Sequence, residues 1–396
     1  MESSIAVSVA YTVVQSQVDL IIAPTVSGNT AKLISKFRPD AKIVALTPSD
    51  RLARSLALHS GVEAINFELC KDTEELIRRS VILAKEEYNC RVGQRIIVTG
   101  GLGFIGSHFI NYVNENTNDE IVLIDKMTYA ANPNNIHKSV KFIQKDICDV
   151  TAEELGEYDY IVNFAAESHV DNSIKDGLPF VKSNVQGTFN MLEVARKNDK
   201  LKKFLHISTD EVYGDMDDFT WSPNHVAQEG DGLHPSSYYS STKAAADLLV
   251  ISANRTFGLP YLITRTCNNY GENQHHEKFI PKIIQSIKND VEVPVYGDGK
   301  QVREWIHADD NSRAIYTLLK SDQFNQIYNI GSEETYTNNQ VVSMISEILG
   351  KEVKYKYVED RLGHDRRYSL NSSKYRIEFG EIQTIKLKEW LEKIIK

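Results

Sequence analysis

A tyrosine and a lysine four residues apart, Tyr239 and Lys243, stand in the segment SYYSSTKAAADLLV. Residues at this spacing share one face of a helix, so the ammonium group can lie near the phenol. A nearby positive charge lowers the pKa of a phenol and lets it act as a base near neutral pH. Tyr238 has the uncharged Thr242 at the same spacing, so we expect Tyr239 to be the base.

Two carboxylates, Asp210 and Glu211, follow Thr209 directly after the apolar segment KFLHIS. Adjacent strand residues point to opposite faces, so both carboxyl groups can reach one pocket only if the strand ends before them. Loops at the carboxyl edge of a parallel sheet are where α/β enzymes place their chemistry. There, two carboxylates in different environments can divide acid and base roles. The structural alternative for these residues is a helix cap.

A glycine-rich turn lies in the segment RIIVTGGLGFIGS, between an expected strand and an expected helix. Gly100 allows a tight turn, Gly103 lets a pyrophosphate approach the backbone, and Gly106 lets the helix pack against the strand. The helix start offers unpaired N–H groups to phosphate. Asp125 closes the next strand, where a carboxylate accepts from the ribose hydroxyls of NAD and repels the 2'-phosphate of NADP. The turn predicts an NAD site, with Asp146 near the adenine.

The elements that position these residues alternate along the whole chain, which indicates βαβ units and a parallel sheet. In the first part we expect helices at 3–18, 29–37, 49–59 and 72–87 and strands at 18–23 and 42–46. In the second part we expect strands at 95–98, 120–124, 158–164, 203–207 and 261–263, and a last helix at 387–395. No Gly/Ser/Pro linker marks the junction near residues 92–94.

Composition excludes several classes of protein. The 396 residues carry a net charge of -9 without a Lys/Arg cluster, which argues against a nucleic-acid partner. No run of about 18 apolar residues exists, so we expect no membrane span. The four cysteines are far apart and form no CxxC pair, so we expect no disulfide framework, no metal and a cytoplasmic location.

Eleven sequence blocks then point to one family. In chain order they are TGGLGFIGS, DKMTYAANPNN, DICD, NFAAESHVDNSI, STDEVYG, YYSSTKAAAD, NNYG, EKFIP, PVYGDGKQVREW, YNIG and GHDRRY. From about residue 94 onward, the chain resembles the dTDP-glucose 4,6-dehydratases among the extended short-chain dehydrogenase/reductases. This resemblance implies an NAD-dependent lyase that forms a 4-keto-6-deoxy sugar, and it implies a homodimer.

The resemblance also implies a role for each chemical residue. Tyr239 takes the proton of the hexose 4-hydroxyl during oxidation at C4, and Thr209 binds the 4-oxygen. Glu211 removes the C5 proton, and Asp210 protonates the C6 hydroxyl as it leaves. Lys243 holds the nicotinamide ribose and tunes the tyrosine.

The matched blocks imply two sets of binding residues. The cofactor set is Gly100, Gly103, Phe104, Ile105, Gly106, Asp125, Lys126, Thr128, Asp146, Ile147, Ala165, Ala166, Tyr239 and Lys243. The substrate set is Ser168, Asn269, Glu277, Lys278, Tyr296, Arg303, Asn329, Arg361 and His364. Guanidinium groups suit a diphosphate because their planar fork can donate twice. Tyr296 is expected against the base.

Three positions depart from the family pattern: Asn172 replaces Arg, and Glu272 and Leu362 each replace Pro. None is a chemical residue, but they leave the base open between thymine and uracil, with GHDRRY favouring dTDP. The alternatives are UDP-glucose 4,6-dehydration, 4-epimerisation, or a regulatory protein that binds a sugar nucleotide without turnover. The carboxylate pair disfavours epimerisation.

The first ninety residues resemble a different family. The segments APTVSGNTAKLISKFRP and AKIVALTPSDRLARSLALHSGV are similar to the C-terminal domain of pyruvate kinase. In that family a TxSGxTA loop, here Thr25, Ser27, Gly28 and Thr30, binds an effector phosphate in some members. Assembly, effector binding and a vestigial passenger all remain open for this part.

The expected fold is therefore α/β with three parts. A small pyruvate kinase C-terminal-like domain, lacking its final strands, spans 1–93. A Rossmann-type doubly wound parallel sheet with the catalytic residues spans 94–269. A substrate-binding lobe, interleaved with that sheet, spans 270–396. The strand RIIVT should serve the dinucleotide fold rather than the first domain.

Overall fold

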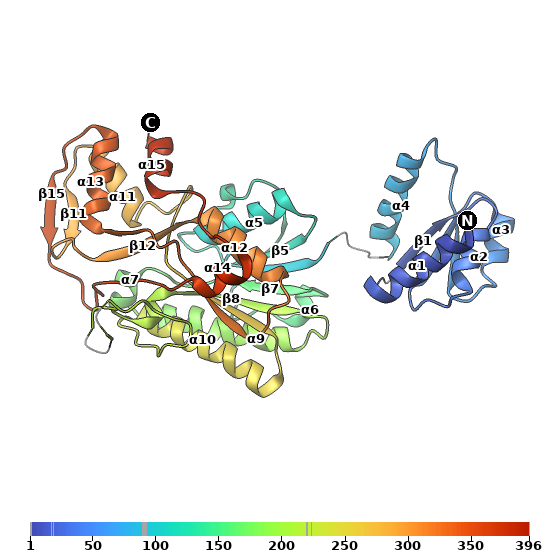
Figure 1. The fold of residues 1–396 in the computed structure, drawn as a ribbon, viewed down its shortest axis with the longest axis horizontal. Helices are drawn as coiled ribbons and strands as arrows, with labels where there is room; N and C mark the ends of the chain where they lie inside the picture. The colour runs from blue at the N-terminus through green and yellow to red at the C-terminus, as the bar shows by residue number, and fades with distance from the viewer. Residues whose placement is uncertain are drawn as a thin grey trace. The chain divides into compact units, whose positions relative to one another are not determined.

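The computed structural model describes residues 2–16, 18, 20–88, 93–218, 221–222 and 224–395. The chain divides into two compact units, Met1–Val92 and Gly93–Lys396, which are drawn in Figure 1 and described separately. Among the described residues, no helix is both long and apolar enough to cross a bilayer.

The first unit is a three-stranded parallel sheet in the order β1-β2-β3. Its strands are β1 (Leu20–Pro24), β2 (Lys42–Thr47) and β3 (Val62–Asn66), and its helices are α1 (Glu2–Ser16), α2 (Asn29–Ser35), α3 (Asp50–Leu56) and α4 (Thr73–Tyr88). The central strand β2 is buried along nearly all its length, which is why its sequence is an unbroken apolar run. β3 was not predicted, because its half-exposed VEAIN sequence lacks such a run.

The second unit is built on a seven-stranded sheet in the order β13-β9-β8-β7-β4-β5-β6. The strands are β4 (Arg95–Thr99), β5 (Glu120–Asp125), β6 (Lys141–Gln144), β7 (Tyr160–Asn163), β8 (Lys203–Thr209), β9 (Tyr261–Thr266) and β13 (Gln326–Ile330). Every pair is parallel, so the predicted doubly wound sheet is confirmed. The strand order reverses between β4 and β7, and ligands of such sheets bind at that point.

The strand RIIVT belongs to this second sheet, as predicted. β4 pairs with β5 on one side and β7 on the other. Among the described residues, the first unit has three strands, and the next strand along the chain, β4, belongs to the second unit.

Helices cover both faces of the large sheet. On one face, α5 (Phe104–Asn116) packs against α12 (Ala308–Lys320) over a core that includes Phe109, Ile110 and Leu318. On the other face, α9 (Thr188–Arg196) and α10 (Tyr238–Phe257) lie over a core that includes Met191 and Val250. The segments between β6 and α9 form α6 (Ala152–Leu155), α7 (Val170–Lys175), α8 (Leu178–Phe180) and a π-helical stretch (Val181–Gly187).

The C-terminal part forms a lobe with its own core around Ile280, Trp305, Val341 and Trp390. Its small sheets join β10 (Asn268–Tyr270), β12 (Val302–His307) and β14 (Thr335–Thr337), and β11 (Val293–Tyr296) with β15 (Tyr355–Val358). Its helices are α11 (Phe279–Lys288), α13 (Asn338–Leu349), α14 (Ser373–Phe379) and α15 (Leu387–Ile395). β13 returns from this part of the chain to the large sheet, where it pairs with β9.

Candidate functional site

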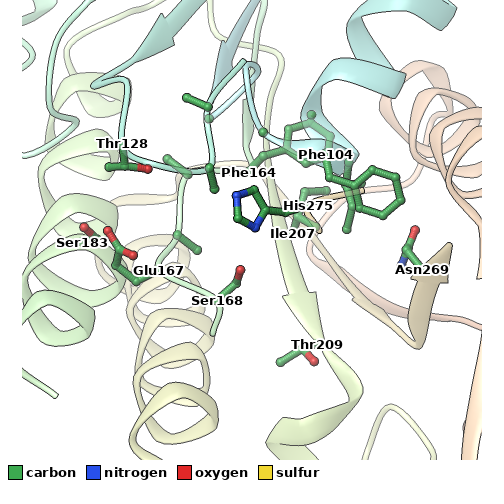
Figure 2. Close-up of a pocket in the computed structure, with 18 of the residues that line it drawn as sticks. Phe104, Thr128, Phe164, Glu167, Ser168, Ser183, Ile207, Thr209, Asn269 and His275 are labelled. Atoms are coloured by element: carbon green, nitrogen blue, oxygen red, sulfur yellow. The ribbon is translucent and has the colours of Figure 1, made fainter. Parts of the chain in front are cut away.

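A pocket of about 340 Å³ opens at the carboxyl ends of the large sheet's strands, within the roughly 300–1,000 Å³ range of small-molecule sites. In Figure 2, Thr128, Glu167 and Ser183 lie on one side of it and Phe104 and Asn269 on the other. The pocket brings together all the residues of the predicted cofactor set and all five of the predicted catalytic set. The two sets share Tyr239 and Lys243, and together they come from segments between residues 100 and 243.

The glycine turn after β4 packs so closely against neighbouring backbone that two of its glycines have no space for a side chain. Gly100 has a φ of 68°, and a Cβ there would lie 2.7 Å from the Ala165 backbone. A Cβ on Gly106 would lie 2.5 Å from the Gly100 carbonyl oxygen. Gly103 caps α5 without a side-chain hydrogen bond, so the first turn of this helix keeps backbone donors for a ligand. The turn therefore fits a pyrophosphate.

A carboxylate, Asp125, closes β5 beside this turn, and a second carboxylate, Glu167, follows β7. Asp125 accepts hydrogen bonds from the backbone N–H groups of Leu102, at 3.1 Å, and Met127, at 2.8 Å, and so ties the glycine turn to the end of β5. Lys126 donates to the Ser183 hydroxyl at 2.7 Å and lies 3.4 Å from Glu167. Carboxylates at these positions suit ribose hydroxyl groups.

The strand β8 ends at Thr209, and Asp210–Tyr213 form one turn of 3-10 helix. The prediction that the strand stops before the two carboxylates is confirmed, and Asp210 and Glu211 both line the pocket. The helix-cap alternative also holds for Thr209, whose Oγ1 accepts from the Glu211 N–H at 3.3 Å. The same hydroxyl donates to Asp210 Oδ1 at 3.1 Å.

The two carboxyl groups have different electrostatic surroundings. Burial and the neighbouring Glu211 charge raise the pKa of Asp210 well above its usual value. Burial also raises the pKa of Glu211, but the positive charges of Arg361 and Arg303 oppose that rise. Asp210 is therefore the group that holds a proton more firmly, and Glu211 the one that releases it more readily.

Tyr239 and Lys243 lie in the first turns of α10, so the predicted helix is confirmed. The expected effect of the lysine on the tyrosine is not found. Lys243 Nζ donates to the Ile207 carbonyl at 2.6 Å and lies 3.3 Å from His206 Nε2. Burial and the charges of Glu211 and Asp210 raise the pKa of Tyr239, and only its hydrogen bond with Thr209 opposes this rise.

Lys243 is itself almost fully buried, and burial lowers its pKa to about 8. Its neighbour Asp247, on the next turn of α10, favours the charged form. Asp247 also binds Arg265 at 2.9 Å. The ammonium is thus held by the Ile207 carbonyl, and the charge of the buried Asp247 carboxylate stabilises it.

The predicted substrate set is divided by the structure. Ser168, Asn269 and Lys278 line the pocket. Tyr296 and Arg361 meet on a common carboxylate instead, where Asp171 lies 3.2 Å from the Tyr296 hydroxyl and 3.5 Å from Arg361 Nη1.

Two further members of the set, His364 and Arg303, are bound within the lobe. The ring of His364 packs edge-on against Tyr296, with centroids 6.1 Å apart. Burial and the Arg361 charge lower the pKa of His364 to about 4. Arg303 donates to the Asp365 carbonyl at 2.9 Å and stacks over the Tyr368 ring.

Asn329 does not reach the pocket. It is fully buried on β13, where its amide accepts from the Tyr213 hydroxyl at 2.8 Å and donates to the Ala227 carbonyl at 2.9 Å. The sequence predicted that Asn329 contacts the substrate. In the structure its side chain is instead hydrogen-bonded within the core. Glu277 lies outside the pocket lining, 3.9 Å from His169 and 3.6 Å from His275.

The pocket also contains residues that the sequence analysis did not single out. They include Phe164, Glu167, Ser183, Thr266, Cys267, Asn268, Gln274 and His275. The rule that ligands bind beyond the carboxyl ends of parallel strands would have found those after β7 and β9. Ser183 and His275 carry no such signal, because tertiary packing brings them to the pocket.

In the first unit, the predicted phosphate loop makes local contacts. Thr25 Oγ1 accepts from the Gly28 N–H at 2.8 Å, and Ser27 Oγ accepts from the Asn29 N–H at 3.4 Å. Gly28 has a φ of 81°, which allows this turn. A surface pocket of the unit shares Asn29 with this loop and is otherwise lined by Lys32, Leu33, Ser35, Lys36, Arg38, His59 and Ser60.

Comparison with known proteins agrees with both sequence resemblances. The pattern of the pyruvate kinase alpha/beta domain matches residues 3–114, which extends through β4 and α5 into the second unit. The pattern of the NAD dependent epimerase/dehydratase family matches residues 96–331. The two matches overlap at the strand and helix that carry the glycine turn.

Curated relatives cover most of the chain. The low-salt glycan biosynthesis protein Agl12 of Haloferax volcanii is 46% identical over 70% of this chain and 90% of its own length. The dTDP-glucose 4,6-dehydratase of Haemophilus influenzae is 40% identical over 76% of this chain and 96% of its own length.

Solved structures give the same result. The dTDP-glucose 4,6-dehydratase DesIV from Streptomyces venezuelae, with NAD and TYD bound, superposes with a TM-score of 0.71 at 39% identity. It covers 76% of this chain and 95% of its own. The UDP-glucuronic acid 4-epimerase from Bacillus cereus has a TM-score of 0.70 at 28% identity, covering 75% of this chain and 96% of its own. The chain therefore belongs to the NAD dependent epimerase/dehydratase family.

Proposed function

We propose that this protein is an NAD-dependent dehydratase that converts dTDP-glucose to dTDP-4-keto-6-deoxyglucose. The observation that carries the proposal is the placement of Asp210 and Glu211 beside Tyr239 in one pocket at the end of β8. Oxidation of a sugar hydroxyl needs one base, whereas loss of water across C5 and C6 needs a base and an acid. The two carboxyl groups supply that additional pair.

The residues of the pocket fit NAD. The Gly100–Gly106 turn leaves backbone donors and space for the pyrophosphate, Asp125 would accept from the adenosine ribose, and Lys243 would hold the nicotinamide ribose. When bound, NAD supplies the redox chemistry, since it accepts hydride from C4 and returns hydride to C6.

In the first step, Tyr239 accepts the proton of the hexose 4-hydroxyl as the C4–H bond breaks. Thr209, whose hydrogen bond with Tyr239 opposes the rise in the pKa of this phenol, would also bind the 4-oxygen. The buried Lys243 ammonium, held by the Ile207 carbonyl, keeps a positive charge near the site where oxygen charge develops.

In the second step, the new 4-keto group acidifies the C5 proton. Glu211 removes this proton, and Asp210 gives its own proton to the C6 hydroxyl, which leaves as water. The electron pair of the C5–H bond becomes the C5–C6 double bond. The pKa order of the two carboxyl groups supports this division, because Asp210 retains its proton more firmly. With NAD bound, C6 would receive hydride, and the protonated Glu211 would return its proton to C5.

Arginines of the lobe would hold the nucleoside diphosphate. Arg361 and Arg303 both influence the Glu211 carboxyl electrostatically, so their charges act at the site where the sugar must lie. Arg361 shares Asp171 with Tyr296, which would lie against the base. A diphosphate that enters here would replace the weak 3.5 Å contact between Arg361 and Asp171.

The substrate assignment predicts a difference between nucleotides. Purified full-length protein should convert dTDP-glucose to a product with the alkaline absorbance of a 4-keto sugar, and it should do so faster than it converts UDP-glucose. The measurement is kcat/KM for both sugar nucleotides, with product identification by NMR. Preference for UDP-glucose would move the assignment to UDP-glucose 4,6-dehydration, and a galactose product would refute dehydration.

A pH prediction follows from the charges around Glu211. Arg361→Gln removes a positive charge that holds the pKa of this buried carboxyl down. Glu211 must be ionised to accept the C5 proton, so kcat/KM falls as the pH is lowered. In the variant, this fall on the acidic side should begin at a higher pH than in the wild type. We expect a shift of up to about one pH unit. The measurement is the pH profile of kcat/KM.

The control for this profile is Arg376→Gln, which removes an arginine paired with Glu333 away from the pocket. Its acidic limb should match that of the wild type. A uniform loss of kcat/KM in Arg361→Gln without any shift would mean that the arginine acts only in binding.

We further propose a cytoplasmic homodimer formed through the helices that flank the Tyr239–Lys243 pair. Large apolar side chains are exposed on α9 and α10, namely Phe189, Leu248 and Phe257. Small-angle scattering of the full chain tests the dimer, and a monomer would contradict it.

For residues 1–93 we propose a structural or assembly role, tested by comparing oligomeric state and kcat with and without this segment.

A further inference from the structure

Two histidines and a glutamate gather in the loop between β10 and α11. His275, His276 and Glu277 each place one ligand atom within 4.8 Å of the others'. The rings of the two histidines lie with centroids 4.2 Å apart, and His275 Nδ1 is 3.6 Å from Glu277 Oε2. A tetrahedral ion with bonds of about 2.0–2.2 Å holds its ligand atoms about 3.3–3.6 Å apart, so these side chains must move closer together to bind one.

A fourth candidate ligand comes from another segment. His169 precedes α7, and its Nε2 lies 3.9 Å from the same oxygen, Glu277 Oε2. Its other ring nitrogen, Nδ1, is buried and has no hydrogen-bond partner among the described residues. Three histidines from two parts of the chain therefore lie around the Glu277 carboxylate.

We propose that His275, His276, Glu277 and His169 bind a divalent transition-metal ion of the zinc class at the edge of the pocket. Imidazole nitrogens with one carboxylate suit zinc and its neighbours, whereas calcium and magnesium prefer oxygen ligands alone. No metal site was predicted from the sequence, because the four cysteines are far apart and form no CxxC pair. Histidines from a loop and a distant helix start give no comparable spacing signal.

The site has a consequence for substrate binding, which rests on the proposed function. His275 lines the pocket, and Lys278 directly follows Glu277 and also lines it. A bound ion would hold this loop and occupy the Glu277 carboxylate. Metal and sugar nucleotide should then weaken each other's binding by the same factor.

Cobalt(II) is the probe, because its visible spectrum reports coordination, and zinc then displaces it. The full-length protein should bind one equivalent of Co²⁺ with the absorption bands of a tetrahedral nitrogen/oxygen site. The double variant His275→Ala/His276→Ala loses two ligands, so its affinity should fall by more than the roughly 10–100-fold that loss of an outer-shell partner costs.

His137→Ala is the matched control, because His137 pairs with Glu115 at 2.9 Å on the surface but lacks a second imidazole. This variant should bind Co²⁺ like the wild type. The thermal unfolding midpoint of each metal-free variant checks that the chain is folded. His169→Ala should weaken binding as well, and unchanged affinity would overturn its placement as a ligand.

Unchanged Co²⁺ binding in the double variant would overturn the site, and so would a thiolate-to-cobalt charge-transfer band or the lack of any stoichiometric binding. A second measurement, KM for dTDP-glucose with and without Zn²⁺, tests the coupling. Metal binding without turnover of any sugar nucleotide would refute the proposed function and leave the metal site standing.

Discussion

Tyr239→Phe should lower kcat for dTDP-glucose by about 10²–10⁴-fold, the usual contribution of a positioned acid–base group. The phenol is the group hydrogen-bonded to Thr209 in the pocket, and its loss leaves no acceptor there for the proton of the 4-hydroxyl. The block should fall on the first step. Reduction of bound NAD on mixing with substrate, followed by stopped-flow absorbance, should slow by the same factor as kcat.

The neighbouring residue supplies a matched control. Tyr238 begins the same helix, but 65% of its surface is exposed and it does not line the pocket. Tyr238→Phe should therefore retain both rates. Normal NAD reduction in Tyr239→Phe would refute the assignment of this tyrosine as the base.

Glu211→Gln should separate the two halves of the reaction. The amide keeps the size of the side chain but cannot accept the C5 proton, so kcat for the whole reaction should fall by about 10²–10⁴-fold. Oxidation at C4 does not use this carboxylate, so reduction of bound NAD should persist. In heavy water, the variant should also fail to exchange the C5 hydrogen of the substrate, which NMR measures directly.

Asp210→Asn is the informative partner of this variant, because the two carboxyl groups are neighbours with different roles. It removes the acid for the C6 hydroxyl but leaves the base, so C5 exchange should continue while water loss stops. Glu193→Gln, at an exposed ion pair with Arg196 on α9, is the control and should behave as the wild type. Unchanged turnover in Glu211→Gln would remove its role as the base.

Much of the fold could be predicted because buried parallel strands have continuous apolar sequences. β4, β5, β7, β8 and β9 were all found this way, and each is buried along most of its length. β3 and β13 were missed. β3 is half exposed, and β13 joins the sheet through a pairing with β9 that connects residues more than sixty positions apart.

Most of the candidate site could be predicted for a related reason. The carboxyl ends of parallel strands meet at one edge, so residues that follow β4, β5, β7 and β8 are brought together by topology alone. The arginines and Tyr296 lie on the lobe, whose placement depends on packing. For that reason the sequence did not show that Asp171 joins Tyr296 to Arg361, or that Asn329 is turned into the core.

By itself, the sequence determined which chemical groups the protein has and that its two parts have different ancestries, because short motifs around strand ends are local. Only the tertiary structure decided how those groups are charged. Lys243 lies on the Ile207 carbonyl rather than on Tyr239, and Asp210 holds its proton more firmly than Glu211. Both results depend on burial and on charges from distant segments, because the field at a buried group is summed over the whole fold rather than over its sequence neighbours.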